Sequence, residues 1–413
     1  TKASTADTTW LTGLRGTAAF IVAFTHFFEG ELNAGFRGYL ADPPEINRYF
    51  FQLPLIRVAF AGQGMVALFF VISAYSISIK PLRLRDNFPK EEFLYYLSSS
   101  TFRRGFRLYT PAFAMEAMGH TAMVLGFYHW PQKYSNGLTG WNHIAFQASY
   151  MLQSLNPISS SKAEPLNGQL WTIPLEFFGS CIVFLTILCT SNLRTSMRPL
   201  LGALIGLLSF WNSSWVLFTY MCGLTICESR IILDRRNAFE PKDQKKSATL
   251  NASTLANWSM LLFSLYLLGL PERPESNPFS NEYLWLRNVT GSGFQIDDIA
   301  QLWRSFGGAL CVFAISNSLT LQTPFKTAAA QYLGKISFGL YLVHILIYQM
   351  WRNPILDFFG WMTGPSSTIA QWVSWGGSGI VLAPVVFGAA DLLTKTVDKS
   401  SIDFSRWIEK CLQ

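Results

Sequence analysis

Apolar runs of the length of a membrane-spanning helix recur along almost the whole chain. A helix needs roughly 20 apolar residues to cross a bilayer. Ten runs near this length are centred on residues 11–28, 58–79, 106–128, 170–190, 198–211, 214–228, 257–270, 303–320, 332–351 and 371–394. Inside lipid, only helices satisfy their backbone hydrogen bonds within single segments of this length. We therefore expect an all-α integral membrane protein with about ten transmembrane helices in a single bundle.

The composition supports the same class. Of the 413 residues, 50% are hydrophobic and only 14% are charged, which is too little charge to cover a soluble domain of this length. The net charge of +7 comes from Lys and Arg placed between apolar runs, so it indicates membrane topology and phosphate contacts rather than a nucleic-acid partner. The six cysteines show no metal-type spacing, and we predict no metal site.

The chain shows neither an internal repeat nor a low-complexity tract. Residues 1–413 are therefore predicted to form one polytopic domain with its core at 10–394. Residues 229–256 are polar and are expected to form a cytosolic loop. Residues 395–413 are expected to form a cytosolic tail. An amphipathic stretch at 143–155 is expected to lie in the membrane interface or to re-enter the bilayer.

The distribution of basic residues predicts which side each loop faces. Lys and Arg concentrate in 80–107, 191–198, 229–246 and the tail, which fall on one side if the ten spans alternate. Because cytosolic loops carry the excess of positive charge, both termini are predicted to be cytosolic. The Asn-Val-Thr sequon at Asn288 then faces away from the cytosol and is a candidate for glycosylation.

The first apolar run carries two ionisable residues, Arg15 and His26. At about 100° per residue their spacing places both on one helix face, about 16 Å apart along the axis. Ionisable groups inside a membrane are costly, which makes both residues functional candidates. Two structural explanations remain open: a hydrogen bond from His26 to a neighbouring helix, and a topology anchor at Arg15.

The fourth run begins with a polar stripe formed by Thr172, Glu176 and Ser180. Their spacing of four residues places them on one helix face. Glu176 is well placed to meet His26, since both are expected toward the outer side. Alternatively, Glu176 offsets the dipole of its own helix.

Three arginines stand at the start of the third run: Arg103, Arg104 and Arg107. Their spacing places all three guanidinium groups on one side of a helix start, an arrangement that binds phosphates through forked hydrogen bonds. The alternative is that they only anchor the span on the cytosolic side.

The ninth run carries Ser337, Tyr341 and His344 on one helix face. Two interpretations remain open for this face. It lines a substrate channel, or it forms a buried polar seam between helices.

Five motifs occur in one order along the chain. They are Arg15-Gly16 with ten residues between Arg15 and His26, Leu68–Ala74, Phe102–Arg107, Leu170–Glu176 and Leu333–His344. Together they cover about residues 10–394 and resemble the membrane-bound acyltransferase-3 family. The sequence around Glu176 resembles that of the fungal branch, whose members often act on secondary metabolites such as terpenoids.

The resemblance implies an enzyme that uses acyl-CoA as a co-substrate and forms an O-acyl product. It implies that Arg15 and His26 are essential, that the three arginines handle the donor and that Glu176 supports the site. We expect acetyl as the acyl group, a small-molecule hydroxyl as the acceptor (a terpenoid, another secondary metabolite or a sugar) and no tightly bound cofactor. Thr12, Ala74 and the Ile-Pro-Leu sequence before Glu176 depart from the usual family pattern, and they leave the acceptor open.

The chemistry suits these residues. A histidine is a suitable base for the acceptor hydroxyl because it titrates near neutral pH. Our hypothesis is that His26 is that base, that Glu176 orients its ring, and that Arg15 and the three arginines hold the phosphates of CoA. A proton-coupled secondary transporter is the main alternative, although the chain lacks repeated halves, and a non-catalytic scaffold is a second. The sequence indicates no oligomeric state.

Overall fold

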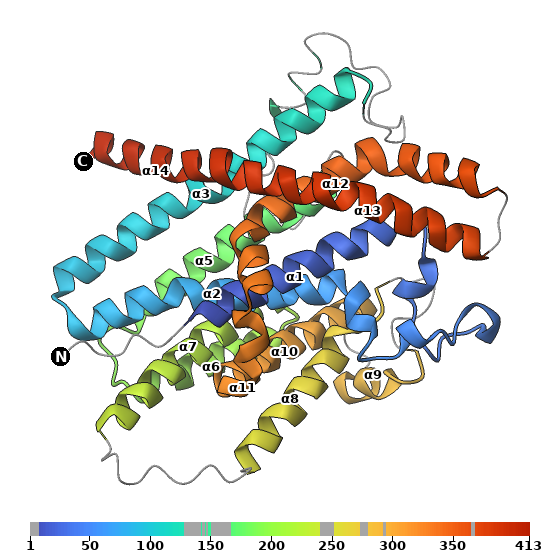
Figure 1. Cartoon of the computed structure of the whole chain (residues 1–413). Coiled ribbons are helices and arrows are strands. Elements are labelled where there is room, and N and C mark those ends of the chain that lie inside the picture. Colours follow the sequence, from blue (N-terminus) through green and yellow to red (C-terminus); the bar gives the residue numbers. More distant parts are fainter. Residues whose placement is uncertain are drawn as a thin grey trace. The chain divides into compact units, whose positions relative to one another are not determined.

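The structure is a computed structural model that describes residues 8–127, 167–239, 252–272, 280–291, 295–364 and 368–413, together with residues 142, 145, 148 and 149. Within these residues the chain is helical and contains no strand (Figure 1). The α-helices are α1 (Thr9–Phe28), α2 (Gly62–Asn87), α3 (Lys90–Val124), α5 (Thr172–Cys189), α6 (Met197–Trp211), α7 (Trp215–Phe239), α8 (Ala252–Leu268), α9 (Leu284–Thr290), α10 (Ile296–Ser316), α11 (Leu319–Gln322), α12 (Ala328–Thr363), α13 (Thr368–Leu393) and α14 (Lys399–Leu412). The all-α prediction is confirmed. The predicted interfacial stretch at 143–155 falls largely outside the described residues.

Short 3-10 turns and one π-helical turn connect these helices. The 3-10 turns are η1 (Asn33–Phe36), η2 (Pro44–Ile46), η3 (Phe50–Gln52), η4 (Arg57–Phe60), η6 (Gly168–Trp171) and η8 (Thr323–Lys326). The π-helical turn Thr394–Asp398 joins α13 to α14.

Seven helical segments of the described chain are long and apolar enough to cross a membrane. They are Thr9–Phe28, Gly62–Asn87, Gly168–Cys189, Trp215–Arg236, Asp297–Ser316, Ala328–Thr363 and Ala370–Leu412. The helices α6 and α8 are apolar but shorter. Every apolar run found in the sequence coincides with a helix. The predicted number of ten transmembrane helices stays a prediction.

Several helices extend beyond the apolar runs that predicted them. Residues 80–107 were expected to link two spans, yet α2 continues to Asn87 and α3 begins at Lys90. The chain leaves the helical conformation at Phe88, which is extended as expected for a residue before a proline. The three arginines of the sequence analysis therefore lie inside α3 rather than at a helix start. Likewise, residues 229–239 continue α7, and the predicted tail is largely α14.

The chain divides into two compact units. Unit 1 comprises Thr1–Ser98 and Gly179–Gly334, and unit 2 comprises Ser99–Phe178 and Lys335–Gln413. The prediction of a single domain stays a prediction.

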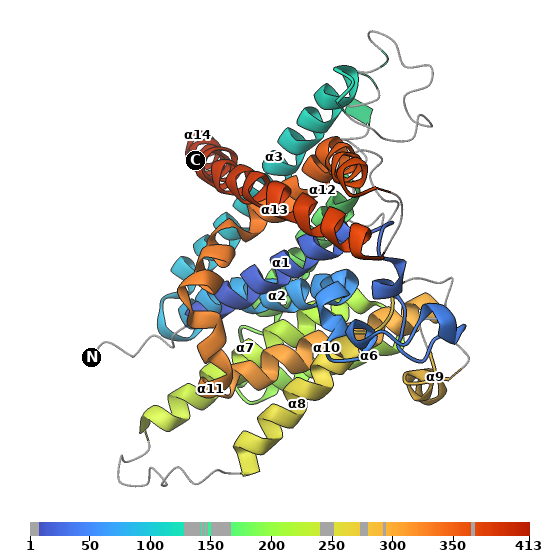
Figure 2. The ribbon, with the colours of Figure 1, turned by 45° about the vertical axis from the view of Figure 1, so that its right-hand side comes forward.

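In unit 1, α2 is the central helix and packs against α1, α7 and α10 (Figures 1 and 2). Glycines permit the closest approaches. A Cβ at Gly64 would overlap the backbone of Leu268 at the end of α8, and a Cβ at Gly223 on α7 would overlap the backbone of Val71 on α2. Helices that lack side chains at the crossing point pack backbone to backbone, as is common in membrane proteins.

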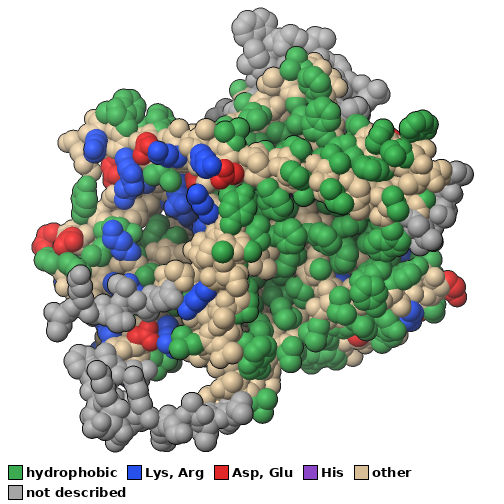
Figure 3. All heavy atoms as spheres, in the orientation of Figure 1, with side chains coloured by type: hydrophobic (Ala, Val, Ile, Leu, Met, Phe, Trp, Pro, Cys, Tyr) green, Lys and Arg blue, Asp and Glu red, His purple; other side chains and the backbone are tan. Residues whose placement is uncertain are grey.

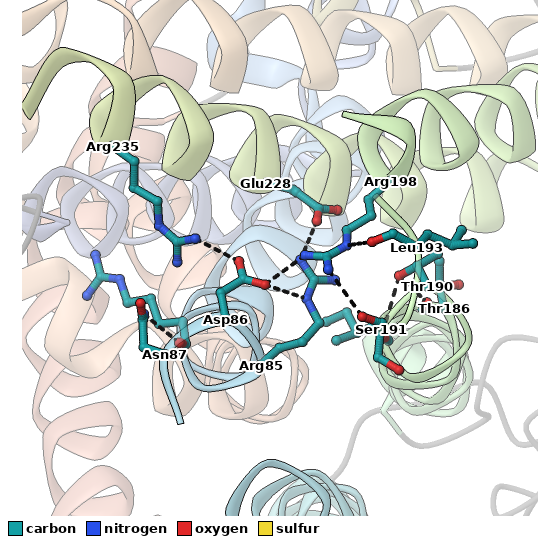
Figure 4. A network of polar contacts seen from close by, with 12 residues as sticks. Arg85, Asp86, Asn87, Thr186, Thr190, Ser191, Leu193, Arg198, Glu228 and Arg235 are labelled. Atoms are coloured by element: carbon teal, nitrogen blue, oxygen red, sulfur yellow. Dashed lines mark hydrogen bonds and ion pairs between the residues drawn. The ribbon is translucent and has the colours of Figure 1, made fainter. Parts of the chain in front are cut away.

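One end of unit 1 is held by a network of charged residues centred on Asp86 (Figure 4). The Asp86 carboxylate accepts hydrogen bonds from Arg198 Nη1 (2.7 Å), Arg235 Nη1 (2.9 Å) and Arg85 Nε (3.2 Å). Arg85 also pairs with Glu228. These residues come from α2, α6 and α7, so three of the segments predicted to be cytosolic meet at one end of unit 1.

The surface of the protein is rich in exposed apolar side chains. In Figure 3 hydrophobic side chains spread over a broad area, while Lys and Arg gather toward the left of that view. Large exposed examples include Trp361, Trp211 and Ile380. Soluble proteins rarely expose so much contiguous apolar surface, whereas a bilayer covers it.

Candidate active site

His26 lies in the last turn of α1, where it is paired with a carboxylate. Its Nδ1 is 2.7 Å from Oε2 of Glu29, and the two side chains are 28% and 50% exposed. Glu29 was not among the predicted site residues. Its position three residues after His26 is the signal that would have found it, since side chains at that spacing are neighbours on a helix.

Arg15 lies near the opposite end of α1 and contacts the start of α12. Its Nη2 donates a hydrogen bond to the backbone oxygen of Gly334 (3.1 Å). The neighbouring Gly16 has no room for a side chain, because a Cβ there would overlap the backbone nitrogen of Gly334. Arg15 therefore has a packing role, and its predicted donor role stays a prediction.

A second carboxylate, Glu272, lies beside the last turn of α1. Its Oε1 accepts a hydrogen bond from the backbone N–H of Gln63 in the first turn of α2 (2.7 Å). Its Oε2 is 3.7 Å from the position that a Cβ at Gly62 would occupy, and that position is 3.2 Å from Thr25 Cγ2. Thr25 directly precedes His26. No local sequence pattern links Glu272 to α1, so the sequence alone does not predict its position.

Two arginines surround the partly buried Glu272. Desolvation raises the pKa of Glu272, while the charges of Arg304 and Arg57 oppose that rise. Arg57 is fully buried, and its guanidinium donates to the backbone oxygens of Arg37 (3.0 Å), Phe36 (3.1 Å) and Gly269. These bonds attach the segment between α1 and α2 to the end of α8.

The three predicted arginines of unit 2 differ in their contacts. Arg104 Nη2 is 2.6 Å from Oε1 of Glu176, and Arg103 Nε is 3.4 Å from Oε2 of Glu409. Arg107 is exposed, and no residue of the described chain forms a hydrogen bond or ion pair with its guanidinium. The pairing of Glu176 with Arg104 was not predicted.

The polar residues of α12 lie in the interior of unit 2. Ser337, Tyr341 and His344 are all buried. The Tyr341 hydroxyl is 2.6 Å from Thr172 Oγ1 and donates to the backbone oxygen of Gln169, while His344 Nδ1 is 2.9 Å from the backbone oxygen of Leu340. These contacts are those of a polar seam between helices. A role as a substrate channel stays a prediction.

The predicted site residues thus fall into two groups. His26 and Arg15 belong to unit 1 together with Glu29 and Glu272, whereas the remaining predicted residues belong to unit 2. The predicted pairing of His26 with Glu176 would join the two units and stays a prediction. Within its own unit, each of the two residues has a different partner.

The helices define a multi-pass membrane protein with ionisable residues on its candidate spans. Its family is an enzyme family: the chain belongs to the acyltransferase-3 family, whose profile, described as an acyltransferase domain, matches residues 8–390. The resemblance seen in the five motifs is confirmed, and the protein is an acyltransferase.

Similar proteins come from fungi. The chain is 25% identical to O-acetyltransferase PaAT-1 of Phomopsis amygdali, in an alignment covering 97% of this chain and 84% of that protein. It is 22% identical to acyltransferase clz18 of Cochliobolus lunatus, over 88% of this chain and 82% of the relative. It is also 22% identical to acyltransferase R4 of a Phoma species, in an alignment covering 78% of this chain and 74% of that protein. No solved structure matches the chain.

Proposed function

We propose that this acyltransferase moves an acetyl group from acetyl-CoA onto a hydroxyl of a small molecule. Support for acetyl and for oxygen as the acceptor comes from PaAT-1, which is named as an O-acetyltransferase and aligns with nearly the whole chain. Acyl-CoA is a water-soluble donor with several phosphates, and α3 offers an exposed cation in Arg107 to receive one of them.

The observation that carries the proposal is the pairing of His26 with Glu29. A carboxylate at 2.7 Å from Nδ1 accepts a hydrogen bond from the N–H at that position, so the neutral ring carries its free lone pair on Nε2. A histidine held in this tautomer is suited to remove a proton from an acceptor hydroxyl. Glu29, directly after the end of α1, takes the orienting role, and Glu176 remains a proposed supporting residue through Arg104.

The remaining roles follow from charge and position. Arg103, Arg104 and Arg107 would meet the phosphates of CoA. Arg107 would make the first contact because its guanidinium is exposed and, within the described residues, Asp398 and Glu176 act on it without forming an ion pair. Arg15 would hold α1 against the start of α12 so that the His26 end of the helix is correctly placed. The acceptor would be a terpenoid, another secondary metabolite or a sugar.

The proposal is tested by complementation. A strain lacking the gene should lose an O-acetylated metabolite and accumulate its free hydroxyl form, and the wild-type gene should restore the product. His26→Ala should insert normally and bind CoA, yet fail to restore it, because a general base typically contributes about 10²–10⁴ in rate. Full restoration by His26→Ala would remove His26 from the mechanism. An unchanged metabolite profile in the deletion strain would contradict the proposed class of acceptor.

A further inference from the structure

The C-terminal helix α14 has no part in the mechanism above, although it contacts the helix that carries the proposed donor arginines. Within unit 2, α14 crosses α3 (Figures 1 and 2). Two side-chain contacts join the helices. Glu409 Oε2 is 3.4 Å from Arg103 Nε, and the ring of Phe404 meets the ring of Phe106 edge-on, with the centroids 6.1 Å apart. A carboxylate of α14 therefore occupies one of the arginines that would bind a phosphate of CoA.

The acidic residues of α14 differ in what they contact. The Asp403 carboxylate is mostly exposed and lies 3.6 Å from Arg406 Nη1 of its own helix. The Glu409 carboxylate is largely covered and pairs with an arginine of α3 instead. Asp403 and Glu409 thus carry the same charge on one helix, and Glu409 is the one that reaches the donor arginines. Asp403 provides a matched control for the effect of charge alone.

Little apolar burial holds α14 against the rest of unit 2. Its buried residues are Ser401 and Ser405, whose hydroxyls donate to backbone oxygens of the same segment, while the large side chain of Trp407 is 60% exposed. Apolar burial is the main source of packing energy, and partly exposed ion pairs add little to it. The π-helical turn Thr394–Asp398 before α14 is a point where helices bend readily. Displacement of α14 from α3 therefore costs little free energy.

We propose that α14 is a displaceable strap over the donor arginines: Glu409 pairs with Arg103 while no donor is bound, and a phosphate of CoA takes its place when the donor arrives. The proposal rests on the proposed function, because it requires the arginines of α3 to bind CoA. A phosphate competes well for a guanidinium, since it accepts forked, charge-assisted hydrogen bonds. The strap lowers the apparent affinity for the donor in proportion to the fraction of molecules in which α14 is released.

The first test is the affinity of the purified full-length protein for CoA, measured by calorimetry in detergent. Glu409→Gln keeps the shape of the side chain and removes its charge, so the dissociation constant should fall about two- to fivefold, as expected when a partly exposed ion pair no longer competes. Phe404→Ala loosens the same contact without a change of charge and should also lower the dissociation constant. Asp403→Asn should leave it unchanged. In an Arg103→Gln background, Glu409→Gln should have no further effect.

The second test follows α14 itself by hydrogen exchange and mass spectrometry. Saturating CoA should speed the exchange of the α14 amides in the wild type, and Glu409→Gln should speed it without CoA. Slower exchange of α14 with CoA bound overturns the strap. So does a CoA affinity that fails to rise in both Glu409→Gln and Phe404→Ala, or an equal gain in Glu409→Gln and Asp403→Asn. Each of these outcomes leaves the donor site intact, whereas a wild-type protein that binds no CoA refutes the donor site and the strap together.

Discussion

At the scale of single residues, Arg107 differs from its two neighbours in what its guanidinium contacts. Arg103 and Arg104 each form an ion pair with a carboxylate, whereas the exposed Arg107 forms none within the described chain, where Asp398 and Glu176 act on it only at longer range. If Arg107 holds a phosphate of CoA, Arg107→Lys should weaken donor binding by about 1–2 kcal/mol, because an ammonium cannot reproduce the forked guanidinium contact. This is roughly a five- to thirtyfold rise in the dissociation constant.

Arg103→Lys is the matched control, since it changes the same residue type four positions away on the same helix. Binding of acetyl-CoA to both purified variants is measured by calorimetry in detergent. Because the Arg103 guanidinium is already paired with Glu409, we expect Arg103→Lys to weaken donor binding less than Arg107→Lys does. Equal affinity of Arg107→Lys and wild type would leave only an anchoring role for Arg107.

The candidate site could be predicted from the sequence only where its residues share one helix. Arg15, His26 and the three arginines were found because ionisable residues are conspicuous in or beside apolar runs. Glu272 was missed because only the packing of α1, α2 and the segment after α8 brings it beside the end of α1. Glu29 was within reach of helix spacing, but it stands just past the apolar run.

At the scale of elements, the first turns of α1 depend on the absence of side chains at two glycines. A Cβ at Gly16 would overlap the backbone of Gly334, and one at Gly13 would overlap the backbone of Phe325. Gly16→Ala should therefore push α1 away from α12 and lower stability by about 1–3 kcal/mol, as overpacking typically does. Thermal unfolding in detergent measures this loss.

Gly388→Ala is the control for that substitution. Gly388 lies inside α13 with open space where a Cβ would stand, so alanine should be neutral or should stabilise by up to about 1 kcal/mol. A Gly16→Ala protein as stable as Gly388→Ala would show that α1 and α12 are not closely packed at this point.

The helices were predictable in existence and position but less so in length. Hydropathy marks the part of a helix that lies in lipid, and it says nothing of polar turns that continue beyond it. The start of α3 contains good helix formers and two acidic residues in its first turn, Glu91 and Glu92, which favour a helix start. Hydropathy likewise does not mark the polar turns of α7, which continues through Arg235 and Arg236 into a region expected to be a loop.

At the scale of the whole molecule, the predicted topology has a direct test. Asn288 is exposed on α9 and is predicted to face away from the cytosol, whereas Arg236 at the end of α7 is predicted to face the cytosol. Single Asn288→Cys and Arg236→Cys variants, made after the exposed Cys189 and Cys411 are replaced by Ser, are treated in intact cells with a membrane-impermeant maleimide. We expect labelling of the first variant before permeabilisation and of the second only after it; labelling of both from one side would overturn the topology.

The buried guanidinium of Arg57 has a consequence for the order in which the protein is made. Two of its acceptors, the oxygens of Phe36 and Arg37, precede it in the chain, but the third belongs to Gly269, beyond α8. During synthesis the Arg57 guanidinium should therefore stay hydrated until α8 has been inserted, because an unpaired charge in the interior is costly. The segment between α1 and α2 can close only at that late stage, so a nascent chain released before Gly269 leaves the ribosome would keep this segment open and accessible to proteases.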